Sequence, residues 1–320
     1  MPSDPRPLDQ NRAAETTRTA ATTAATPPRI LAVVVTYRPP AALFENMESL
    51  RKQLTDVLIV DNGSGESFEQ LLQACEVTLG IQVLRQPSNL GIAAALNAGV
   101  RRAIVAGFDW VATFDQDSTI TPDFFGAMLS AYQLCPSRQQ VTLVAPVLCE
   151  NGPDYQAHRQ RAQPALYSFA RTAMTSGSLI KTGVFAQAGF YDESLFMDYV
   201  DYDFCLRLWK QGWQIIRAQR AYLLHRLGAA ETHSFFGLKV TIKSHSPWRR
   251  YHIMRNRIIV FRRYAFSFPG WCLHDFSWIF LELTKILLFE NEKAAKLRQV
   301  ARGIADGLAG RTGRRPPGAN

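Results

Sequence analysis

Two aspartates stand one residue apart where an apolar run of the sequence ends. The run is WVATFDQDS, residues 110–118, and the two carboxylates belong to Asp115 and Asp117. In an extended backbone, residues two positions apart point to the same side, so both carboxylates can reach one ligand. Mg²⁺ and Mn²⁺ bind one or two such carboxylates together with substrate phosphate oxygens. Triplets of this kind also occur in ordinary loops, so the surrounding elements must decide between the two interpretations.

The surrounding elements predict a parallel α/β sheet. The runs ILAVVVT (30–36), DVLIV (56–60) and IQVLR (81–85) are rich in β-branched residues, as buried parallel strands are. Helical spacing of apolar residues separates the runs, over 42–54, 68–75 and 89–107. Because strands and helices alternate, the first ~150 residues are expected to form a mostly parallel sheet with right-handed crossovers.

Polar residues follow every one of these strands. In a parallel sheet the carboxyl ends of the strands lie at one edge, and ligands bind there. We therefore expect one binding site that contains Thr36, Tyr37, Arg38, Asp61, Asn62, Asn89, Gly91, Asp115, Gln116 and Asp117. This convergence is more specific than any single motif.

Several of these residues have a structural alternative. Asp61 can accept hydrogen bonds from a nucleotide base or ribose, or it can form an Asp-Asn-Gly turn. Asn89 and Gly91 begin a helix whose free N–H groups favour anions, although Asn89 can simply cap that helix. Asn97, deeper in the helix, faces either ligand or solvent. No GxGxxG follows the first strand, which counts against a dinucleotide-binding Rossmann domain.

A second group of acids lies downstream, in SLFMDYVDYDFCLRL. Asp198, Asp201 and Asp203 precede a segment with helical spacing. One of them can be a general base, and the others can cap the helix or pair with Arg207. The spacing alone does not choose among them.

The charge of the chain is unevenly distributed. The formal net charge is +9, yet residues 232–274 contain no Asp or Glu. The basic residues of this stretch are Lys239, Lys243, Arg249, Arg250, Arg255, Arg257, Arg262 and Arg263. A patch of one sign suits an anionic ligand or lipid surface, and the alternative is a solvated helix face. We expect no nucleic-acid partner, because no nucleic-acid-binding pattern is present.

An apolar segment over residues 271–289 follows the basic stretch. It contains Asp275, Glu282 and Lys285, which are costly at a bilayer centre. We expect a helix that packs in the core or a dimer, or one that lies in a membrane interface. The five cysteines are far apart in apolar contexts, which predicts buried, reduced thiols in a cytoplasmic protein. Residues 1–28, rich in Ala, Thr and Pro, are expected to be a disordered tail.

The ordered series of motifs resembles a known family. The series VVVTYRP, LIVDNGS, NLGIAAALNAG, FDQDS, SGSLI and GFYDESLFMDYVDYDFCLR, followed by a His, spans roughly residues 30–264. It is similar to family 2 inverting glycosyltransferases of the GT-A fold, and in particular to bacterial rhamnosyltransferases of O-antigen and surface polysaccharide synthesis. The resemblance implies a GT-A domain over 29–235, with a nucleotide-binding half at 29–120 and an acceptor half at 121–235. Residues 236–320 would form a basic, largely helical region.

The resemblance also implies residue roles. Asp61 would bind the base, and Asp115 and Asp117 the ribose and the metal–diphosphate. Asp201 would be the catalytic base, although Val200 stands where the family has a further acid, so Asp198 or Asp203 can share the role. His225 would complete the shell of a Mg²⁺ or Mn²⁺ ion, or it is a structural residue. Ser176, Gly177 and Ser178, with Asp198 and Asp203, would lie on the acceptor side.

The expected activity is transfer of a sugar from a nucleotide diphosphate, with dTDP-β-L-rhamnose as donor and a glycan or lipid-linked glycan as acceptor. A UDP-sugar is the alternative donor. We expect contact with the inner face of the cytoplasmic membrane, and a homo-oligomer is compatible with the sequence. A sugar-phosphate nucleotidyltransferase would need a Gly-rich basic loop after its first strand, which VVVTYRPPAAL lacks. An inactive binding module would not need the full set of acids.

Overall fold

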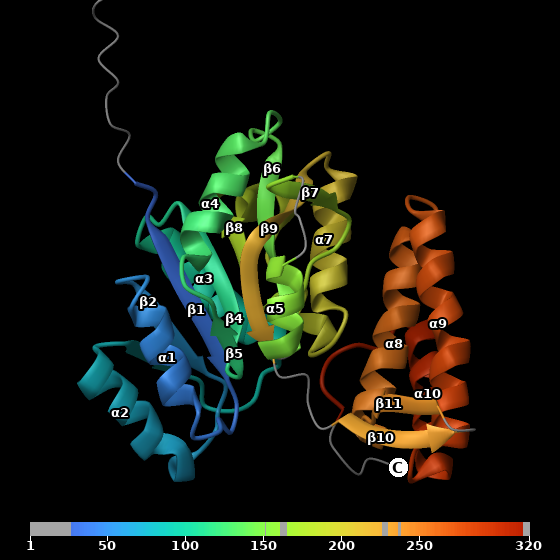
Figure 1. Cartoon of the computed structure of the whole chain (residues 1–320). Helices are drawn as coiled ribbons and strands as arrows, with labels where there is room; N and C mark the ends of the chain where they lie inside the picture. Colours follow the sequence, from blue (N-terminus) through green and yellow to red (C-terminus); the bar gives the residue numbers. More distant parts are fainter. Residues whose placement is uncertain (1–26, 151, 161–164, 226–229, 236–237, 316–320) are drawn as a thin grey trace, which may run out of the picture.

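The computed structural model describes residues 27–150, 152–160, 165–225, 230–235 and 238–315, and side chains are not described at residue 225 or in the last two strands (Figure 1). The predicted tail therefore lies outside the described residues, apart from Pro27 and Pro28. The described chain forms a large sheet covered by helices, beside a separate group of C-terminal helices. All five cysteines are buried and free, as predicted.

The first half of the sheet is parallel, as predicted. Its strands are β1 (Ile30–Thr36), β2 (Val57–Asp61), β3 (Gln82–Arg85) and β4 (Trp110–Asp115), in the order β3-β2-β1-β4. The register places Thr36 beside Asp61 and Val35 beside Asp115. The carboxyl ends of these strands therefore meet at one edge, which is the geometry that the sequence predicted for a site.

The second half of the sheet is mixed. It contains β5 (Ser118–Ile120), β6 (Val141–Cys149), β7 (Tyr167–Ala170), β8 (Ser178–Lys181) and β9 (Gln214–His225). Strand β8 runs antiparallel to both β4 and β6, while β6 and β9 are parallel. The short β5 and β7 pair antiparallel with β9. Because β8 reverses direction between β4 and β6, these two strands also end at the site edge.

Helices cover both faces of the sheet, because successive side chains of β1 point to opposite faces and are apolar on both. Leu31, Val33 and Val35 pack in one core with α3 (Ile92–Val105) and α7 (Val200–Lys210). Ile30, Ala32 and Val34 pack in the other core with α1 (Leu43–Arg51), α2 (Glu69–Leu79) and α4 (Phe124–Leu134). The remaining short helices are α5 (Gly152–Gln160), α6 (Phe185–Ala188), η1 (Glu66–Phe68), η2 (Thr182–Val184) and η3 (Glu193–Leu195).

The C-terminal region is helical, as predicted, but begins with an antiparallel hairpin that the sequence did not indicate. The hairpin is β10 (Ala230–Phe235) and β11 (Leu238–Lys243). Three helices follow: α8 (Pro247–Tyr264), α9 (Pro269–Leu288) and α10 (Lys293–Leu308). Helices α8 and α10 pack closely because α10 presents Gly303 and Gly307, where an added Cβ would come within 2.6 Å of Tyr251 O and 2.8 Å of Arg255 O.

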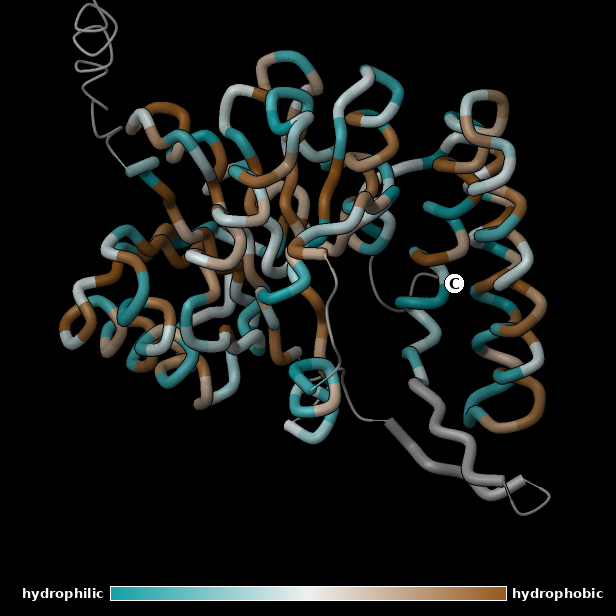
Figure 2. Tube along the Cα trace, turned by 45° about the horizontal axis from the view of Figure 1, so that its top comes forward, coloured by the Kyte–Doolittle hydropathy of each residue, from teal (hydrophilic) through white to brown (hydrophobic). Residues whose placement is uncertain are grey.

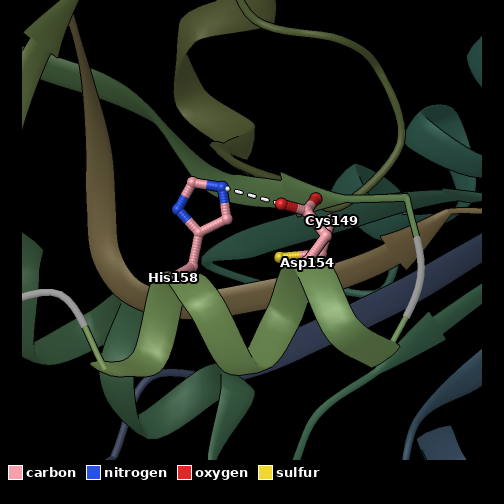
Figure 3. Close-up of side chains that lie close together, drawn as sticks. All are labelled: Cys149, Asp154 and His158. Atoms are coloured by element: carbon pink, nitrogen blue, oxygen red, sulfur yellow. Dashed lines mark ion pairs between the residues drawn. The ribbon is translucent and has the colours of Figure 1, made fainter. Parts of the chain in front are cut away.

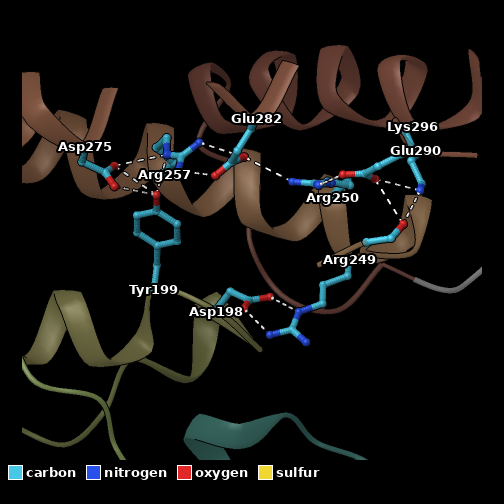
Figure 4. Close-up of polar contacts among 10 residues, drawn as sticks. Asp198, Tyr199, Arg249, Arg250, Arg257, Asp275, Glu282, Glu290 and Lys296 are labelled. Carbon is cyan, nitrogen blue, oxygen red and sulfur yellow. Dashed lines mark hydrogen bonds and ion pairs between the residues drawn. The ribbon is translucent and has the colours of Figure 1, made fainter. Parts of the chain in front are cut away.

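Four arginines of the basic stretch are paired with acids from other parts of the chain (Figure 4). Arg255 and Arg262 donate to oxygen atoms of uncharged groups instead, and the side chains of Lys239 and Lys243 lie outside the described part of the structure. Arg250 pairs with Glu282 and Glu290, and Arg257 with Asp275 and Glu282. Arg249 and Arg263 pair with Asp198, Asp192 and Asp203. The lack of acids within residues 232–274 thus overstated the free positive charge, because the compensating carboxylates lie elsewhere in the sequence.

Helix α9 exposes an apolar face. Leu273, Phe280 and Leu287, spaced by seven residues, are 67%, 66% and 51% exposed. Figure 2 shows hydrophobic residues along this outer helix. The predicted helix over 271–289 is therefore confirmed, with apolar residues on its outer side as well. Among the described residues, no helix is both long and apolar enough to span a bilayer.

Candidate active site

A cleft of about 620 Å³ opens at the carboxyl edge of the sheet. The sheet contributes Asp115, the start of α7 contributes Asp198 and Asp201, and the C-terminal helices contribute Arg249 and Trp271. Segments far apart in the sequence thus line one space. Its walls combine aromatic and apolar side chains with a concentration of carboxylates, which is the make-up of a ligand site.

Asp61 is buried at the end of β2 and is held by its neighbours. Thr36 Oγ1 donates to Asp61 Oδ1 at 3.1 Å, and Ser64 N donates to Oδ2 at 3.0 Å. The Ser64 hydroxyl donates to Asp61 as well and accepts from Arg38 N at 2.8 Å. Thr36, Arg38 and Asp61 therefore form one cluster, and the turn-forming alternative for Asp61 is correct at least in part.

Gln116 fixes the loop after β1. Its side-chain oxygen accepts from Tyr37 N at 2.8 Å, and its carbonyl oxygen accepts from Asn46 Nδ2 at 3.0 Å. Asn46 in turn accepts from Thr119 Oγ1 at 2.8 Å. The loop that carries Tyr37 and the loop that carries the two aspartates are thus joined.

The start of α3 is closed by protein groups. Asn89 Oδ1 accepts from Asn62 Nδ2 at 3.2 Å and from Gly91 N at 3.0 Å. The first helical N–H, of Ile92, donates to Phe196 O at 2.9 Å. Gly91 has φ 94°, and a Cβ there would lie 2.5 Å from Phe196 O, so this close approach requires glycine. The helix start therefore holds the Phe196 loop in place.

Asn97 faces neither solvent nor the cleft. It is 1% exposed, and its amide nitrogen donates to Tyr191 O at 2.9 Å and to Glu193 Oε1 at 2.8 Å. Its amide oxygen accepts from Tyr191 N at 2.9 Å. Asn97 is not among the residues that line the cleft. Its side chain holds the loop before α7.

The segment 176–178 supports the aspartate loop from behind. Ser176 Oγ accepts from Asp115 N at 3.0 Å and lies 2.7 Å from Ser118 Oγ. Gly177 N donates to Thr113 O at 2.7 Å, and Ser178 Oγ donates to Met174 O at 2.6 Å. These contacts hold the backbone of Asp115 in position. Residues 176–178 do not line the cleft themselves, whereas the preceding Thr172, Met174 and Thr175 do.

Oxygen ligands at the aspartate loop fit a hard divalent cation. Asp115 lines the cleft, and Asp117 lies in the turn between β4 and β5. A pair of carboxylates beside a cleft with further acids is the donor set that Mg²⁺ or Mn²⁺ prefers. His225 ends β9, where its backbone pairs with Ser118 in the same turn region. The side chain of His225 lies outside the described part of the structure.

Asp201 has the environment of a general base. It lies in the first turn of α7 and lines the cleft. The pKa of the Asp201 carboxyl is raised to about 7, mainly by burial and also by the carboxylates of Asp198 and Asp115, while hydrogen bonding to Tyr202 N (2.8 Å) opposes the increase. A carboxyl group whose pKa lies near 7 can take a proton efficiently near neutral pH.

The other two acids of this motif are engaged in ion pairs. Asp203 is 1% exposed and accepts from Arg207 Nε at 3.0 Å, Arg263 Nη1 at 2.9 Å and Tyr264 Oη at 3.0 Å. This confirms the alternative in which one acid pairs with Arg207. Asp198, with φ 54°, lines the cleft and forms a two-pronged ion pair with Arg249 (Figure 4).

Sequence reasoning missed the residues of α8 that hold residues 195–199, the loop before Asp201. Asn256, completely buried, donates to the carbonyls of Leu195, Met197 and Asp198 at 2.8, 2.6 and 3.0 Å. Arg257 donates to Tyr199 Oη and pairs with Asp275 and Glu282. The sequence signal for these residues was the basic stretch itself. It indicated an anionic partner, but it did not show that the partners are carboxylate and carbonyl groups of the same chain.

One further cluster of possible metal ligands lies outside the cleft. Within the described ranges, Cys149, Asp154 and His158 bring one ligand atom each within 4.8 Å of one another (Figure 3). Asp154 already accepts from Glu150 N at 3.0 Å and pairs with His158 one helical turn away at 3.5 Å. Burial raises the pKa of the Cys149 thiol to about 11, so the thiolate that a metal needs is disfavoured. These contacts are those of a surface helix.

A mostly parallel α/β sheet, curled toward a mixed half, with a carboxylate-rich cleft at its carboxyl edge defines the class of GT-A proteins. Residues 31–195 match the family described as Glycosyl transferase family 2. The chain belongs to this family and is a glycosyltransferase.

Curated relatives cover most of the chain. The dTDP-rhamnosyl transferase RfbF of Shigella flexneri is 26% identical over 302 residues, which are 89% of this chain and 97% of that protein. The galactofuranosyltransferase GlfT1 of Mycobacterium tuberculosis is 27% identical over 79% of this chain and 88% of its own length. The N-acetylglucosaminyl-diphospho-decaprenol L-rhamnosyltransferase of M. tuberculosis is 28% identical over 60% of this chain and 74% of its own length.

Solved structures confirm the fold. The mannosyltransferase PcManGT of Pyrobaculum calidifontis, in complex with GDP-Man and Mn²⁺, superposes with a TM-score of 0.56 at 16% identity, covering 89% of this chain and 76% of that one. Residues 1–349 of S. aureus TarS, in complex with UDP-GlcNAc, give a TM-score of 0.51 at 14% identity, covering 88% and 81%. The predicted GT-A fold is thereby confirmed.

Proposed function

We propose that the protein is an inverting rhamnosyltransferase of surface polysaccharide synthesis that uses dTDP-β-L-rhamnose as donor. The observation that carries the inverting chemistry is a single half-buried carboxylate, Asp201, whose pKa is about 7 and which lines the same cleft as Asp115. The rhamnose donor is supported by two relatives whose names specify rhamnosyl transfer, one of them from dTDP-rhamnose.

The residues divide the reaction between the two sides of the cleft. In the proposal, Asp61, with Thr36 and Arg38 around it, holds the nucleoside, and Asp115 and Asp117 hold the ribose and the diphosphate with Mg²⁺ or Mn²⁺. When bound, the cation would stabilise negative charge on the leaving diphosphate. Asp201 takes the proton of the acceptor hydroxyl as that oxygen attacks C1 of the sugar from the face opposite the diphosphate. One displacement of this kind inverts the anomeric centre.

The proposed acceptor is a glycan carried on a lipid diphosphate. Trp271, His274 and Trp278 line the cleft from α9, whose exposed residues are mostly apolar. A membrane-embedded acceptor would thus reach the cleft along the same helix. We therefore propose peripheral attachment to the inner face of the cytoplasmic membrane, through α9 and not through the basic stretch.

Radiolabelled or mass-resolved donors test the proposal. The purified protein, with Mn²⁺ and a lipid-diphosphate glycan, is expected to release dTDP from dTDP-β-L-rhamnose and to give an α-linked product. Asp117→Ala is expected to abolish metal-dependent dTDP binding, as measured by isothermal titration calorimetry. Asp201→Asn should retain that binding within about threefold and lose at least 10³-fold in kcat, because only the base is removed.

Two results would contradict the proposal. A UDP-sugar that is turned over in preference to dTDP-rhamnose would replace the donor while keeping the reaction class. Near-normal turnover of Asp201→Asn, with loss of turnover in Asp198→Asn, would move the base to Asp198. Asp203→Asn serves as the control that disturbs the ion pairs of α7 without touching the cleft.

A further inference from the structure

Arg249 differs from its neighbours on α8. Arg250, Arg255 and Arg257 are no more than 4–5% exposed, and each donates to groups that hold the fold together. The Arg249 side chain is 45% exposed and lines the cleft. Within the described ranges, the hydrogen bonds of its guanidinium group go to Asp198 alone, through Nε at 3.1 Å and Nη2 at 2.9 Å (Figure 4).

The carboxylates of the cleft create a negative field that a cation at the position of Arg249 offsets. Asp115, Asp198 and Asp201 face the cleft together, and Asp115 and Asp198 each interact with Asp201 strongly enough to raise its pKa. The second arginine of the lining, Arg257, is already paired with Asp275 and Glu282. A diphosphate that enters this space meets three carboxylates, so a divalent cation and one accessible guanidinium are needed to offset the repulsion.

We propose that Arg249 is a donor-binding residue that exchanges Asp198 for the diphosphate of the nucleotide sugar. The planar fork that now binds two carboxylate oxygens matches two phosphate oxygens equally well. Asp115 also interacts with Arg249, which places the guanidinium within electrostatic range of the loop that would carry the metal and diphosphate. This inference rests on the proposed function, because it concerns the donor of that same site.

The exchange links donor binding to the base. While Arg249 holds Asp198, its positive charge partly cancels the field of that carboxylate at Asp201. Once Arg249 moves to the diphosphate, Asp198 is no longer neutralised, and Asp201 becomes a stronger base. In the transfer itself the bond from C1 to the diphosphate oxygen breaks, and its electron pair leaves with the nucleoside diphosphate. The new bond joins C1 to the acceptor oxygen, whose proton goes to Asp201.

Calorimetric titration of the full chain with dTDP and with thymidine, in the presence of Mn²⁺, tests the role. Arg249→Gln is expected to weaken dTDP binding at least tenfold and to leave thymidine binding unchanged, because only the diphosphate contact is lost. Arg249→Lys should recover part of the dTDP affinity. Asp198→Asn, which frees Arg249 from its ion pair, is expected to bind dTDP as tightly as the wild type or more tightly.

Arg101→Gln is the matched control, because Arg101 also forms an exposed ion pair with a carboxylate, Glu193 at 3.4 Å, outside the cleft. Equal dTDP affinity in wild type and Arg249→Gln would overturn the inference. So would unchanged dTDP binding with a raised KM for a lipid-diphosphate acceptor, because Arg249 would then read the acceptor's diphosphate. If the wild type itself binds no nucleoside diphosphate, the proposed function fails instead.

Discussion

Asp201, the proposed base, differs from its two neighbouring acids in its surroundings. Three acids lie within six residues of sequence, yet Asp203 accepts three hydrogen bonds from cationic or hydroxyl groups and Asp198 is paired with Arg249. Asp201 receives one backbone N–H and two neighbouring negative charges. Arg249 lies 51 residues from Asp198, and Arg263 and Tyr264 lie 60 and 61 residues from Asp203, so these partners cannot be read from the motif's spacing.

The raised pKa of Asp201 predicts the pH dependence of the reaction. A base must be deprotonated, and burial keeps the proton of the Asp201 carboxyl on up to about pH 7. We expect kcat/KM to fall about tenfold for each pH unit below 7 and to level off above it. The measurement is initial rate against pH at subsaturating donor and saturating Mn²⁺.

Asp198→Asn sharpens this test, because it removes one of the negative charges that raise the pKa of Asp201. The midpoint of the kcat/KM profile should therefore move to lower pH in Asp198→Asn. It should stay in place in Glu48→Gln, a charge change on the exposed side of α1. A wild-type profile that is flat down to pH 5 would contradict the assigned pKa of Asp201.

At the scale of elements, the sequence predicts what is periodic and local. The β-branched runs and the helices between them appear where the periodicity placed them, and the register of β1 with β2 and β4 brings Thr36, Asp61 and Asp115 to one edge. The reversal of β8 and the hairpin of β10 and β11 were not predicted, because pairing direction depends on connections and not on the composition of a short strand.

Helix α8 holds the loop before α7, which precedes the proposed base, and Asn256 makes three of the contacts. Its amide nitrogen donates to the carbonyls of Leu195, Met197 and Asp198. We predict that Asn256→Ala destabilises the protein by about 1–3 kcal/mol, because buried carbonyl groups lose their donor. It should also lower kcat at least tenfold while KM for the donor changes little. Chemical denaturation and steady-state kinetics measure the two effects.

Hydrogen exchange separates a local effect from a general one. Amides of residues 195–201 should exchange faster in Asn256→Ala, while those of β1 and β2 keep their protection. Ser277→Ala, on the exposed side of α9, is the control and should leave both rates and exchange unchanged. Normal kcat in Asn256→Ala would show that the loop keeps its position without α8.

At the scale of the whole molecule, the outer side of α9 exposes a row of apolar residues. Leu273, Phe280 and Leu287 lie in one stripe, and Leu281 and Leu288 are also exposed on this helix. Exposed apolar surfaces of this extent mark interaction sites. Because the arginines of α8 are paired internally, apolar burial and not surface charge should provide most of the binding free energy.

A vesicle flotation assay tests this assignment. The wild type is expected to float with both neutral and anionic phosphatidylcholine-based vesicles, with weak dependence on salt. Changing Leu273, Phe280 and Leu287 together to Ser should reduce the bound fraction at least tenfold, since burial of each side chain contributes about 1.5–3 kcal/mol. The matched control changes Val77, Val105 and Leu134, which are exposed on other helices, to Ser.

The oligomeric state separates membrane attachment from the alternative, in which a second copy of the chain covers the same surface. If light scattering shows a dimer that the α9 triple variant dissociates, and vesicles do not bind the wild type, then a second copy covers this face and membrane attachment is wrong. Flotation that falls strongly with salt would instead show that charge contributes to membrane binding, although the arginines are paired within the protein.

The contacts of residues 313 and 314 bear on the order in which parts of the chain fold during translation. Gly313 N donates to Ser194 O at 2.6 Å, Gly313 O accepts from Arg255, and Arg314 donates to Asn89 O at 3.2 Å. The loops before α3 and α7 are thus clasped by residues translated about 120 positions or more later. A nascent chain still attached to the ribosome can form strands β1 to β4 early, but the loops before α3 and α7 gain these contacts only after residues 313 and 314 have been translated.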